Sequence, residues 1–544
     1  MAMRKPGTFR ANAAVREARG GACRWRCAAA LVLLSAWPAV AAVAHDAEIP
    51  MRIPLAPMGY QGIVPEFRLA GSSMLTVNFV DNDHLLVTFG VRRLMTREID
   101  PPPDDDDRVV GAYLVELPSG RVLARTEWRL HDRLQYLWSL GHGRFLLRVR
   151  DRLSVIAPIE AGNAGDPFRE TTLLRVERHI VALLVSSNCD LLTVETTRRA
   201  TGPDEVGEIS FGNPAGKDPA PVQINFYRLN SSGGDLVATP AGAIRTQSAI
   251  SLPLTTAGFL DVIEGGKGRW LFNFDEHAGK VDELAEYDTN CFPKPMFIGH
   301  SEFVAFGCRG GEGKQDLVGF NLKGDEMWRL SFYDSYISPT FAFAPEGGRF
   351  AIGRTLVSGD IDPNFPLTAS VVTAQEVRVY QSYDGRQLFR IECSPVERAG
   401  QNFDLSADGM RLAVVRETTV RHAATKDDPA YTQLEAAVEV YPLPALSDYD
   451  KSEVKAAEAT APADTGARID LSLERVSTHA APESAPGNSS DAANGSSGDT
   501  GAAPAEAATE PANATAVEGD ALPEAPRKQP TLYGPGEKPE TKPQ

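Results

Sequence analysis

Residues Phe341–Arg354 read FAFAPEGGRFAIGR and residues Phe403–Arg416 read FDLSADGMRLAVVR, and the two stretches align without a gap. Matching positions carry Phe341 and Phe403, Gly347 and Gly409, Arg349 and Arg411, Ala351 and Ala413, and Arg354 and Arg416. A third copy, VSSNCDLLTV from Val185, keeps the same frame. Internal repeats of this kind decide the fold before any single motif does.

Each copy predicts two strands joined by a tight turn. Residues Arg411–Val415 alternate in polarity as a strand does, and Asp408 and Gly409 supply the chemistry of a hairpin turn. A second hairpin follows the first: VELPSGRVL from Val115 matches YQSYDGRQL from Tyr380, with Gly120 and Gly385 in register. The repeating unit is therefore two hairpins, or four antiparallel strands.

Seven such units are predicted, starting near residues 76, 137, 181, 252, 297, 341 and 403. Four-stranded units repeated about every 43 to 72 residues are typical of a β-propeller. A pair of β-sandwiches competes with this fold but would not need the same unit seven times. We expect an all-β, seven-bladed propeller of four-stranded antiparallel blades over residues 45–446. Ring closure should mix the termini, since residues 66–69 precede the first hairpin.

The turn FDLSADGMRLAV from Phe403 resembles the strand pairs of YVTN-type and WD-repeat-like β-propeller proteins. The resemblance covers most of residues 45–446 at the level of the motif. It implies a propeller fold in an exported bacterial protein. No Trp-Asp dipeptide closes a unit, which departs from a strict WD repeat.

Long insertions separate the two hairpins of four units. They are Met95–Arg108, Arg198–Pro221, Ser358–Gln375 and Glu417–Thr432. In a propeller these connections lie on one face, so we expect the binding site there, around the mouth of the channel. Loops longer than about 12 residues are usually functional or disordered, and simple tolerance of insertions would also explain them.

The N-terminus has the pattern of a secretory signal. Seven Lys and Arg residues precede the apolar run CAAALVLLSAW at Cys27–Trp37, and Ala42-Val43-Ala44 supplies small residues for signal peptidase. We predict a signal peptide over residues 1–44, cleaved after Ala44. A retained anchor would need roughly 20 apolar residues, which this run lacks. The mature chain is therefore expected to be exported and to have no transmembrane segment.

The other end changes character at about Ser447. Residues 447–544 are dominated by Ala, Pro, Glu, Ser, Gly and Thr, with Tyr449 and Tyr533 as the only aromatic residues. A segment so poor in large apolar side chains cannot offset its ordering entropy. We predict a disordered acidic tail with a helical turn or two around Lys451–Ala459. The tail would be either a solubilising segment or a spacer that contacts a partner.

Composition and motifs exclude several functions. The formal net charge of -17 argues against a nucleic-acid partner. Asp104–Asp107 offer oxygens to calcium but lack the alternating spacing of a calcium loop, so we interpret them as a solvated loop. The histidines have no zinc-ligand spacing, and no Gly-x-Ser-x-Gly, P-loop or dinucleotide-binding motif occurs. We assign no catalytic or metal-binding residue and no cofactor.

We expect a binding or scaffold propeller of the bacterial cell envelope, with an envelope protein, a glycan or a small molecule as partner. The alternative is a metal-dependent hydrolase or lyase whose side chains converge at the channel mouth. A wall component tethered through the acidic tail is a third interpretation. Fold alone does not decide among them.

Two of the mature cysteines are placed to pair. Cys291 and Cys308 flank a predicted hairpin, and they come within a strand-width or two of each other if Ile298 is opposite Phe303. An exported protein meets oxidising conditions, so we predict a Cys291–Cys308 disulfide, with buried free thiols as the alternative.

Peptide mapping without reductant should recover a peptide in which Cys291 is joined to Cys308. Cys189 and Cys393 should be alkylated in the same digest. Recovery of Cys291 and Cys308 as alkylated thiols would contradict the pairing.

Overall fold

A computed structural model of the chain describes residues 50–61, 75–91, 108–130, 135–163, 165–198, 222–232, 235–246, 254–266, 268–277, 280–308, 314–333, 339–357, 372–393, 402–423 and 430–469. The predicted cleavage site at Ala44 and the acidic run Asp104–Asp107 lie outside them. In the described part, no helix is both long enough and apolar enough to cross a membrane.

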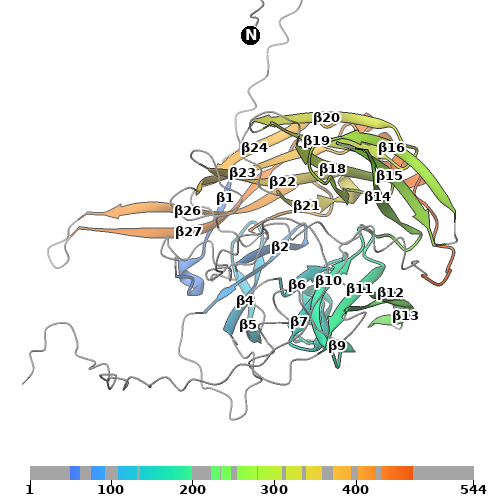
Figure 1. Cartoon of the computed structure of the whole chain (residues 1–544). Coiled ribbons are helices and arrows are strands. Elements are labelled where there is room, and N and C mark those ends of the chain that lie inside the picture. Colours follow the sequence, from blue (N-terminus) through green and yellow to red (C-terminus); the bar gives the residue numbers. More distant parts are fainter. Residues whose placement is uncertain are drawn as a thin grey trace, which may run out of the picture. The chain divides into compact units, whose positions relative to one another are not determined.

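Seven antiparallel sheets form the ring of a propeller, as predicted, and Figure 1 labels most of their strands. Blade 1 is β2 (Thr76–Asp81), β3 (His84–Gly90), β4 (Arg108–Glu116) and β5 (Val122–Leu130). Blade 2 is β6 (Leu137–Ser139), β7 (Phe145–Val149), β8 (Arg152–Ile156) and β9 (Thr171–Arg175), with helix α1 (Pro158–Gly162) before β9. Blade 3 is β10 (His179–Val185), β11 (Leu191–Thr197), β12 (Val222–Ser232) and β13 (Asp235–Thr246).

Blade 4 departs from the four-stranded pattern. It consists of β14 (Gly258–Gly266), β15 (Arg269–Glu276) and β16 (Val281–Asp288). An isolated antiparallel bridge pairs Leu254 with Phe259 of β14. Leu254 therefore lies beside β14, at the position that the innermost strand occupies in the other blades. The predicted unit start near residue 252 thus marks a strand that is reduced to one bridge in the described residues.

The remaining sheets complete the ring. Blade 5 is β17 (Lys294–Phe297), β18 (Glu302–Cys308), β19 (Lys314–Asn321) and β20 (Glu326–Tyr333). Blade 6 is β21 (Thr340–Ala344), β22 (Arg349–Val357), β23 (Val372–Gln381) and β24 (Gln387–Cys393), with the 3-10 helix η3 (Pro345–Gly347) between β21 and β22. Blade 7 is β25 (Phe403–Leu405), β26 (Arg411–His422), β27 (Tyr431–Pro442) and β1 (Met51–Pro54), and η1 (Ala56–Met58) follows β1.

The two ends of the propeller meet in blade 7. Strand β1 pairs antiparallel with β27, with Met51 opposite Val440 and Pro54 opposite Ala437. The expectation that closure mixes the termini is confirmed, but the strand is Met51–Pro54, while residues 66–69 lie outside the described ones. Four backbone pairs thus join the first strand of the chain to the last sheet.

The hydrophobic core is divided among the seven seams between neighbouring blades. Each of seven buried clusters contains side chains of two adjacent sheets. Representative pairs, in order from the seam between blades 7 and 1, are Val438 with Val87, Leu86 with Leu137, Leu153 with Leu192, Phe226 with Phe259, Phe272 with Phe303, Val304 with Phe350, and Val379 with Leu412. Because both faces of a sheet are buried, its inner strands are apolar nearly throughout.

The repeated turn has the same hydrogen bonds in two blades. In blade 7 the Ser406 hydroxyl accepts from the Arg411 amide at 2.9 Å, and the Gly409 amide donates to the Ser406 carbonyl at 2.7 Å. In blade 3, Ser186 accepts from Leu191 and Cys189 in the same way, both at 2.9 Å.

The glycines of the turns have two different reasons to be glycine. Gly120, Gly385 and Gly409 take positive φ angles of 68°, 65° and 67°. In the turn of blade 6 it is Gly348 that has a positive φ, of 57°, whereas a Cβ on Gly347 would collide with the Asp408 carbonyl of blade 7. Gly347 therefore permits a close approach between two blades.

The repeated arginines cross-link the blades. The buried Arg349 donates to the carbonyls of Gly409 and Pro444, both at 2.6 Å, and so ties blade 6 to blade 7. Arg411, at the matching repeat position, donates to the Asn82 carbonyl and ties blade 7 to blade 1. The repeat is thus maintained by contacts between neighbouring units as well as by the turn itself.

The connections divide the ring into two edges. The turns between strands one and two and between strands three and four, such as 346–348, 384–385 and 407–409, form what we call the short-turn edge. The second and third strands are joined at the opposite, long-loop edge, where residues 92–107, 199–221, 358–371 and 424–429 lie outside the described ones. The predicted loop Glu417–Thr432 is too long at both ends, since β26 runs to His422 and β27 starts at Tyr431. Figure 1 shows this hairpin projecting from blade 7.

Replacing Gly409 with Val should destabilise the protein by about 1–3 kcal/mol, because φ is positive there and a Cβ would lie 2.9 Å from Cδ of Arg349. Thermal unfolding measures the effect. Cys189, at the same turn position with φ of 59°, provides the matched control, and Cys189→Gly should not lower the melting temperature. Equal losses in both variants would contradict this account of the turn.

Candidate functional site

A cluster of arginines lies on blade 6 toward the long-loop edge, where the binding site is predicted. Glu376 accepts from Arg378 at 2.8 Å and pairs with Arg354 at 3.0 Å and Arg390 at 2.5 Å. The guanidinium of Arg354 lies 4.1 Å from the ring centre of Phe332 on blade 5. The cluster therefore lies in the seam between blades 5 and 6.

The charge of the Glu376 carboxylate is stabilised by the three arginines around it. Burial by itself would raise the pKa of the Glu376 carboxyl, but the hydrogen bond and charge of Arg378, with Arg354 and Arg390, outweigh it and lower that pKa. Arg416, the repeat partner of Arg354, similarly binds Glu439 at 2.9 Å in blade 7. The recurrence of this pairing in two blades indicates that both arginines hold neighbouring strands together, and Arg354 also contacts Phe332 across the seam.

No group of three or more His, Cys, Asp or Glu side chains within the described ranges is arranged to hold a metal ion. His277 hydrogen-bonds the Thr255 carbonyl through Nε2 at 3.2 Å, and His300 lies in the turn between β17 and β18. Neither His277 nor His300 therefore belongs to a metal-binding group among the described side chains.

The structure joins Cys291 and Cys308 by a disulfide, with Cα atoms 5.6 Å apart. Phe297, one residue earlier than the expected Ile298, is opposite Phe303, so Cys308 lies at the long-loop end of β18. Cys189 and Cys393 are free thiols, and burial raises the pKa of Cys189 to about 11. The disulfide links the chain before β17 to the end of β18 within blade 5.

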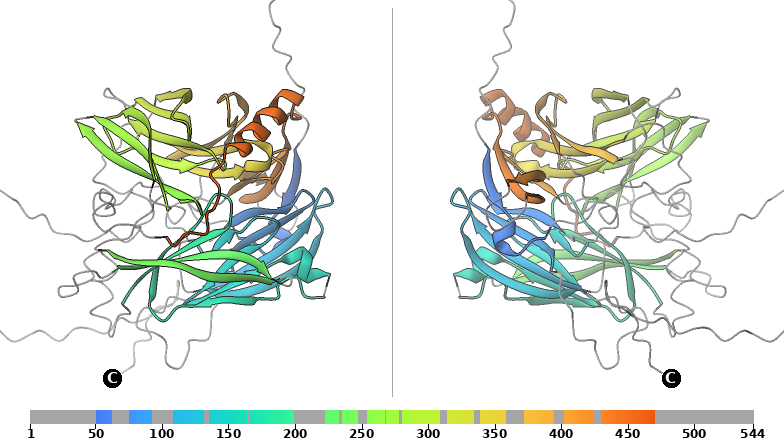
Figure 2. Two further views of the ribbon diagram at one scale, coloured as in Figure 1. Left: turned by 90° about the vertical axis from the view of Figure 1, so that its right-hand side faces the viewer. Right: turned by 90° about the vertical axis from the view of Figure 1, so that its left-hand side faces the viewer.

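The short-turn edge carries a feature of which the sequence predicted only a helical turn or two around Lys451–Ala459. Residues 447–469, which we call the C-terminal clamp, are helix α3 (Asp448–Ala459) and an extended segment that crosses to blade 3. Figure 2 shows α3 against blades 5 and 6, with the following segment descending toward blade 3. The boundary of the predicted disordered tail at Ser447 is therefore wrong, since the chain is packed on the propeller as far as Ile469.

A capping box and one carboxylate fix the start of α3. The Ser447 hydroxyl accepts from the Asp450 amide, and the Asp450 carboxylate accepts from the Ser447 amide at 2.8 Å. The same carboxylate accepts from Tyr383 and from Arg386, both at 2.7 Å. Burial opposes ionisation here, but Tyr383, Ser447 and Arg386 lower the pKa of Asp450 to about 2. The spacing of Ser447 and Asp450 is the signal that would have predicted this helix start.

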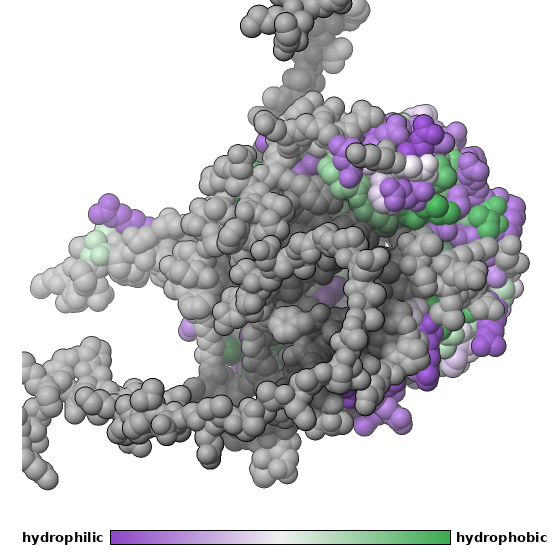
Figure 3. Space-filling view, in the orientation of Figure 1, coloured by the Kyte–Doolittle hydropathy of each residue, from purple (hydrophilic) through white to green (hydrophobic). Residues whose placement is uncertain are grey.

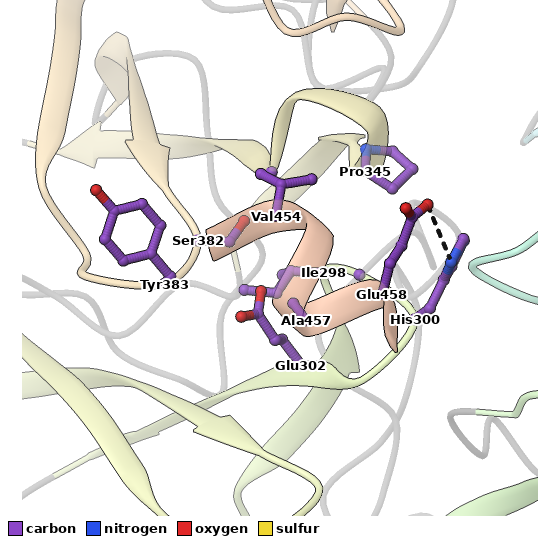
Figure 4. A pocket seen from close by; sticks show the side chains of 11 residues that line it. Ile298, His300, Glu302, Pro345, Ser382, Tyr383, Val454, Ala457 and Glu458 are labelled. Carbon is purple, nitrogen blue, oxygen red and sulfur yellow. Dashed lines mark ion pairs between the residues drawn. The ribbon is translucent and has the colours of Figure 1, made fainter. Parts of the chain in front are cut away.

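A small pocket lies beneath α3, between the turns of blades 5 and 6 (Figure 4). Val454 fills the space over Gly348, where a Cβ would collide with it. Ser301 donates to the Ala457 carbonyl at 2.6 Å, and His300 lies 4.0 Å from Glu458. Glu302, which is 8% exposed, lines the same pocket. The helix thus occupies the hollow that the two blades form.

The extended segment has its own anchor on blade 3. Arg228 holds Asp464 through two contacts of 3.1 Å and donates to the Ala467 carbonyl at 2.6 Å. The Ile469 amide donates to the Ala241 carbonyl at 3.0 Å, and its side chain is 1% exposed in the cluster between blades 3 and 4. The clamp therefore connects blades 5 and 6 with blade 3 along the short-turn edge.

The exposed large apolar side chains are distributed over several blades. They are Val122, Leu123, Val181, Val237, Ile263 and Val281, with Tyr449 on α3. On the face shown in Figure 3, hydrophilic and hydrophobic residues are interspersed. Scattered apolar residues of this kind are normal on a protein surface and do not define a docking site.

No protein-family model matches the sequence, and no curated protein matches it. An acylaminoacyl peptidase of Pyrococcus horikoshii aligns at 10% identity and a TM-score of 0.39, over 70% of this chain and 54% of its own. A puromycin-hydrolyzing peptidase of Mycobacterium tuberculosis aligns at 12% identity and 0.34, over 69% and 55%. Sqt1 of Chaetomium thermophilum, bound to the N-terminus of ribosomal protein L10, aligns at 12% and 0.34, over 69% and 98%. This chain spans about half the length of the two peptidases, and the similarity concerns the fold alone.

A chain that ends at Leu446 should be less stable than one that ends at Asp470, because only the longer chain retains Ile469 in its cluster. The loss should be about 2 kcal/mol or more, which is the value of burying one isoleucine side chain. Chemical denaturation of both chains beside the full-length protein measures it. Equal midpoints for the two truncated chains would contradict a stabilising clamp.

Proposed function

We propose that the protein is an exported, non-enzymatic binding propeller of the bacterial cell envelope, and that its ligand contacts the long-loop edge. The observation that carries this proposal is the difference between the two edges. Three long connections, 92–107, 199–221 and 358–371, join second to third strands, whereas the short-turn edge of blades 5 and 6 is occupied by α3 of the same chain. Binding residues are commonly placed on loops that a rigid framework holds.

Export rests on the sequence of the first 44 residues, where a basic segment, an apolar run and Ala42-Val43-Ala44 follow one another. The disulfide between Cys291 and Cys308 is compatible with this compartment, since such bonds persist in oxidising surroundings. The mature chain would then begin at His45, shortly before β1.

The charge of the long connections indicates the class of ligand. Each of the four segments 92–107, 199–221, 358–371 and 424–429 contains more Asp and Glu than Lys and Arg. Acidic loops repel anions and attract cations over about 8 Å at physiological ionic strength. A protein or glycan with a basic surface is therefore the favoured partner, and its binding should weaken as salt is added.

The test compares two variants with the same change in charge. One variant replaces Asp104–Asp107 with Asn, and the control replaces four exposed acids of the short-turn edge with their amides: Asp83, Asp235, Asp325 and Glu326. Each purified protein is immobilised and exposed to an envelope extract at two salt concentrations. We expect the Asp104–Asp107 variant to capture much less of the partner whose binding weakens as salt is added. The control should capture as much of that partner as the wild type does.

Equal retention by both variants would exclude the acidic loop from binding, and equal loss would indicate attraction to net charge alone.

Elemental analysis of the purified protein distinguishes the alternative function. A stoichiometric metal, with a melting temperature that rises and saturates as the ion is added, would favour a metal-dependent hydrolase or lyase over the binding propeller.

A further inference from the structure

The carboxyl group of Glu302 lies in the pocket beneath α3, where burial disfavours its negative charge. Glu302 begins β18 and is 8% exposed, and it points from blade 5 toward the helix in Figure 4. Among the described residues, none donates a hydrogen bond to this carboxylate. A buried carboxylate without a donor or a cation is strongly disfavoured, so this group is expected to hold a proton when the helix is docked.

The other charged groups around the pocket reinforce this expectation. From α3, Glu453 acts on Glu302 with a like charge, and Glu458 lies 4.0 Å from His300 of the blade 5 turn. From blade 6, Tyr383 and Arg386 are both bound to Asp450. Arg386 is therefore engaged with Asp450 and His300 lies beside Glu458, and the charge that acts on Glu302 is that of Glu453.

We propose that docking of α3 takes up a proton on Glu302, so that the helical part of the clamp closes on blades 5 and 6 in mildly acidic surroundings and releases in mildly alkaline ones. The proposal goes beyond ligand binding at the long-loop edge and does not depend on it.

The direction follows from proton linkage. Burial, with the charge of Glu453, raises the pKa of Glu302 to about 7 when the helix is docked, against 4.5 for the ordinary carboxyl. Because the pKa of Glu302 is higher in the docked state than in the undocked state, protonation of Glu302 stabilises docking. This stabilisation is complete below pH 4.5 and is lost as the pH rises through about 7. Asp450 stays ionised throughout this range, so its contribution to docking does not change with pH.

Hydrogen–deuterium exchange of the amides in α3 tests the proposal on the full-length protein. Wild type and Glu302→Gln are compared at the same pH, at 5.5, 7.0 and 8.5, so that the chemical exchange rate cancels. Gln has the shape of the protonated acid and carries no charge. The protection factor of the α3 amides in wild type, divided by that in Glu302→Gln, should fall roughly thirtyfold from pH 5.5 to 8.5. Proton linkage gives this factor for a carboxyl whose pKa is 4.5 when the helix is undocked and about 7 when it is docked.

One further variant sharpens the test. Glu453→Gln should reduce the dependence on pH by removing the like charge that acts on Glu302. If Glu302→Gln follows the wild type at every pH, Glu302 is not the proton acceptor and the proposal fails. If the protection of α3 in wild type, relative to Glu302→Gln, is constant from pH 5.5 to 8.5, docking takes up no proton and the proposal fails as well.

Discussion

Each blade of this propeller buries its apolar side chains against the next blade. Neighbouring residues on one strand face opposite neighbours, as Leu86 does toward blade 2 and Val87 toward blade 7. A single sheet therefore has no core of its own, and every seam depends on the two sheets beside it. The stability of the whole fold rests on a closed ring, which explains why the repeated Arg349 and Arg411 reach across seams to backbone carbonyls of the following blade.

This dependence leaves the two edges of the ring free to diverge. Turns on the short-turn edge are brief because they only join adjacent strands, whereas the long-loop edge tolerates insertions that no seam requires. The chain uses this freedom differently at each edge. On one it carries acidic connections that vary in length, and on the other it places its own C-terminal clamp, which is anchored by Asp450 on blade 6 and by Asp464 on blade 3.

Much of the fold was predictable because a repeat records the same local physics several times. The turn at Asp408-Gly409, its copy at Asn188-Cys189 and the alternating strands beside them were enough to locate seven blades. The clamp was not predictable from composition, since its order depends on tertiary contacts made by Ile469, Val454 and Asp450 with residues far away in the sequence. For the same reason no local pattern brings Glu302 beneath a helix some 150 residues later.

The closure of blade 7 also determines the order in which the molecule can be completed. Met51–Pro54 is the first strand of the chain to be synthesised, yet its partner Ala437–Val440 is among the last segments of the propeller to be made. Until then one flank of blade 1, including Val77 and Leu85, has no neighbour to cover it. The nascent protein must therefore carry an open, apolar seam through most of its synthesis, and contacts this distant in sequence form slowly. Protection of that flank, by a chaperone or by delayed release, is a requirement that this topology places on the cell.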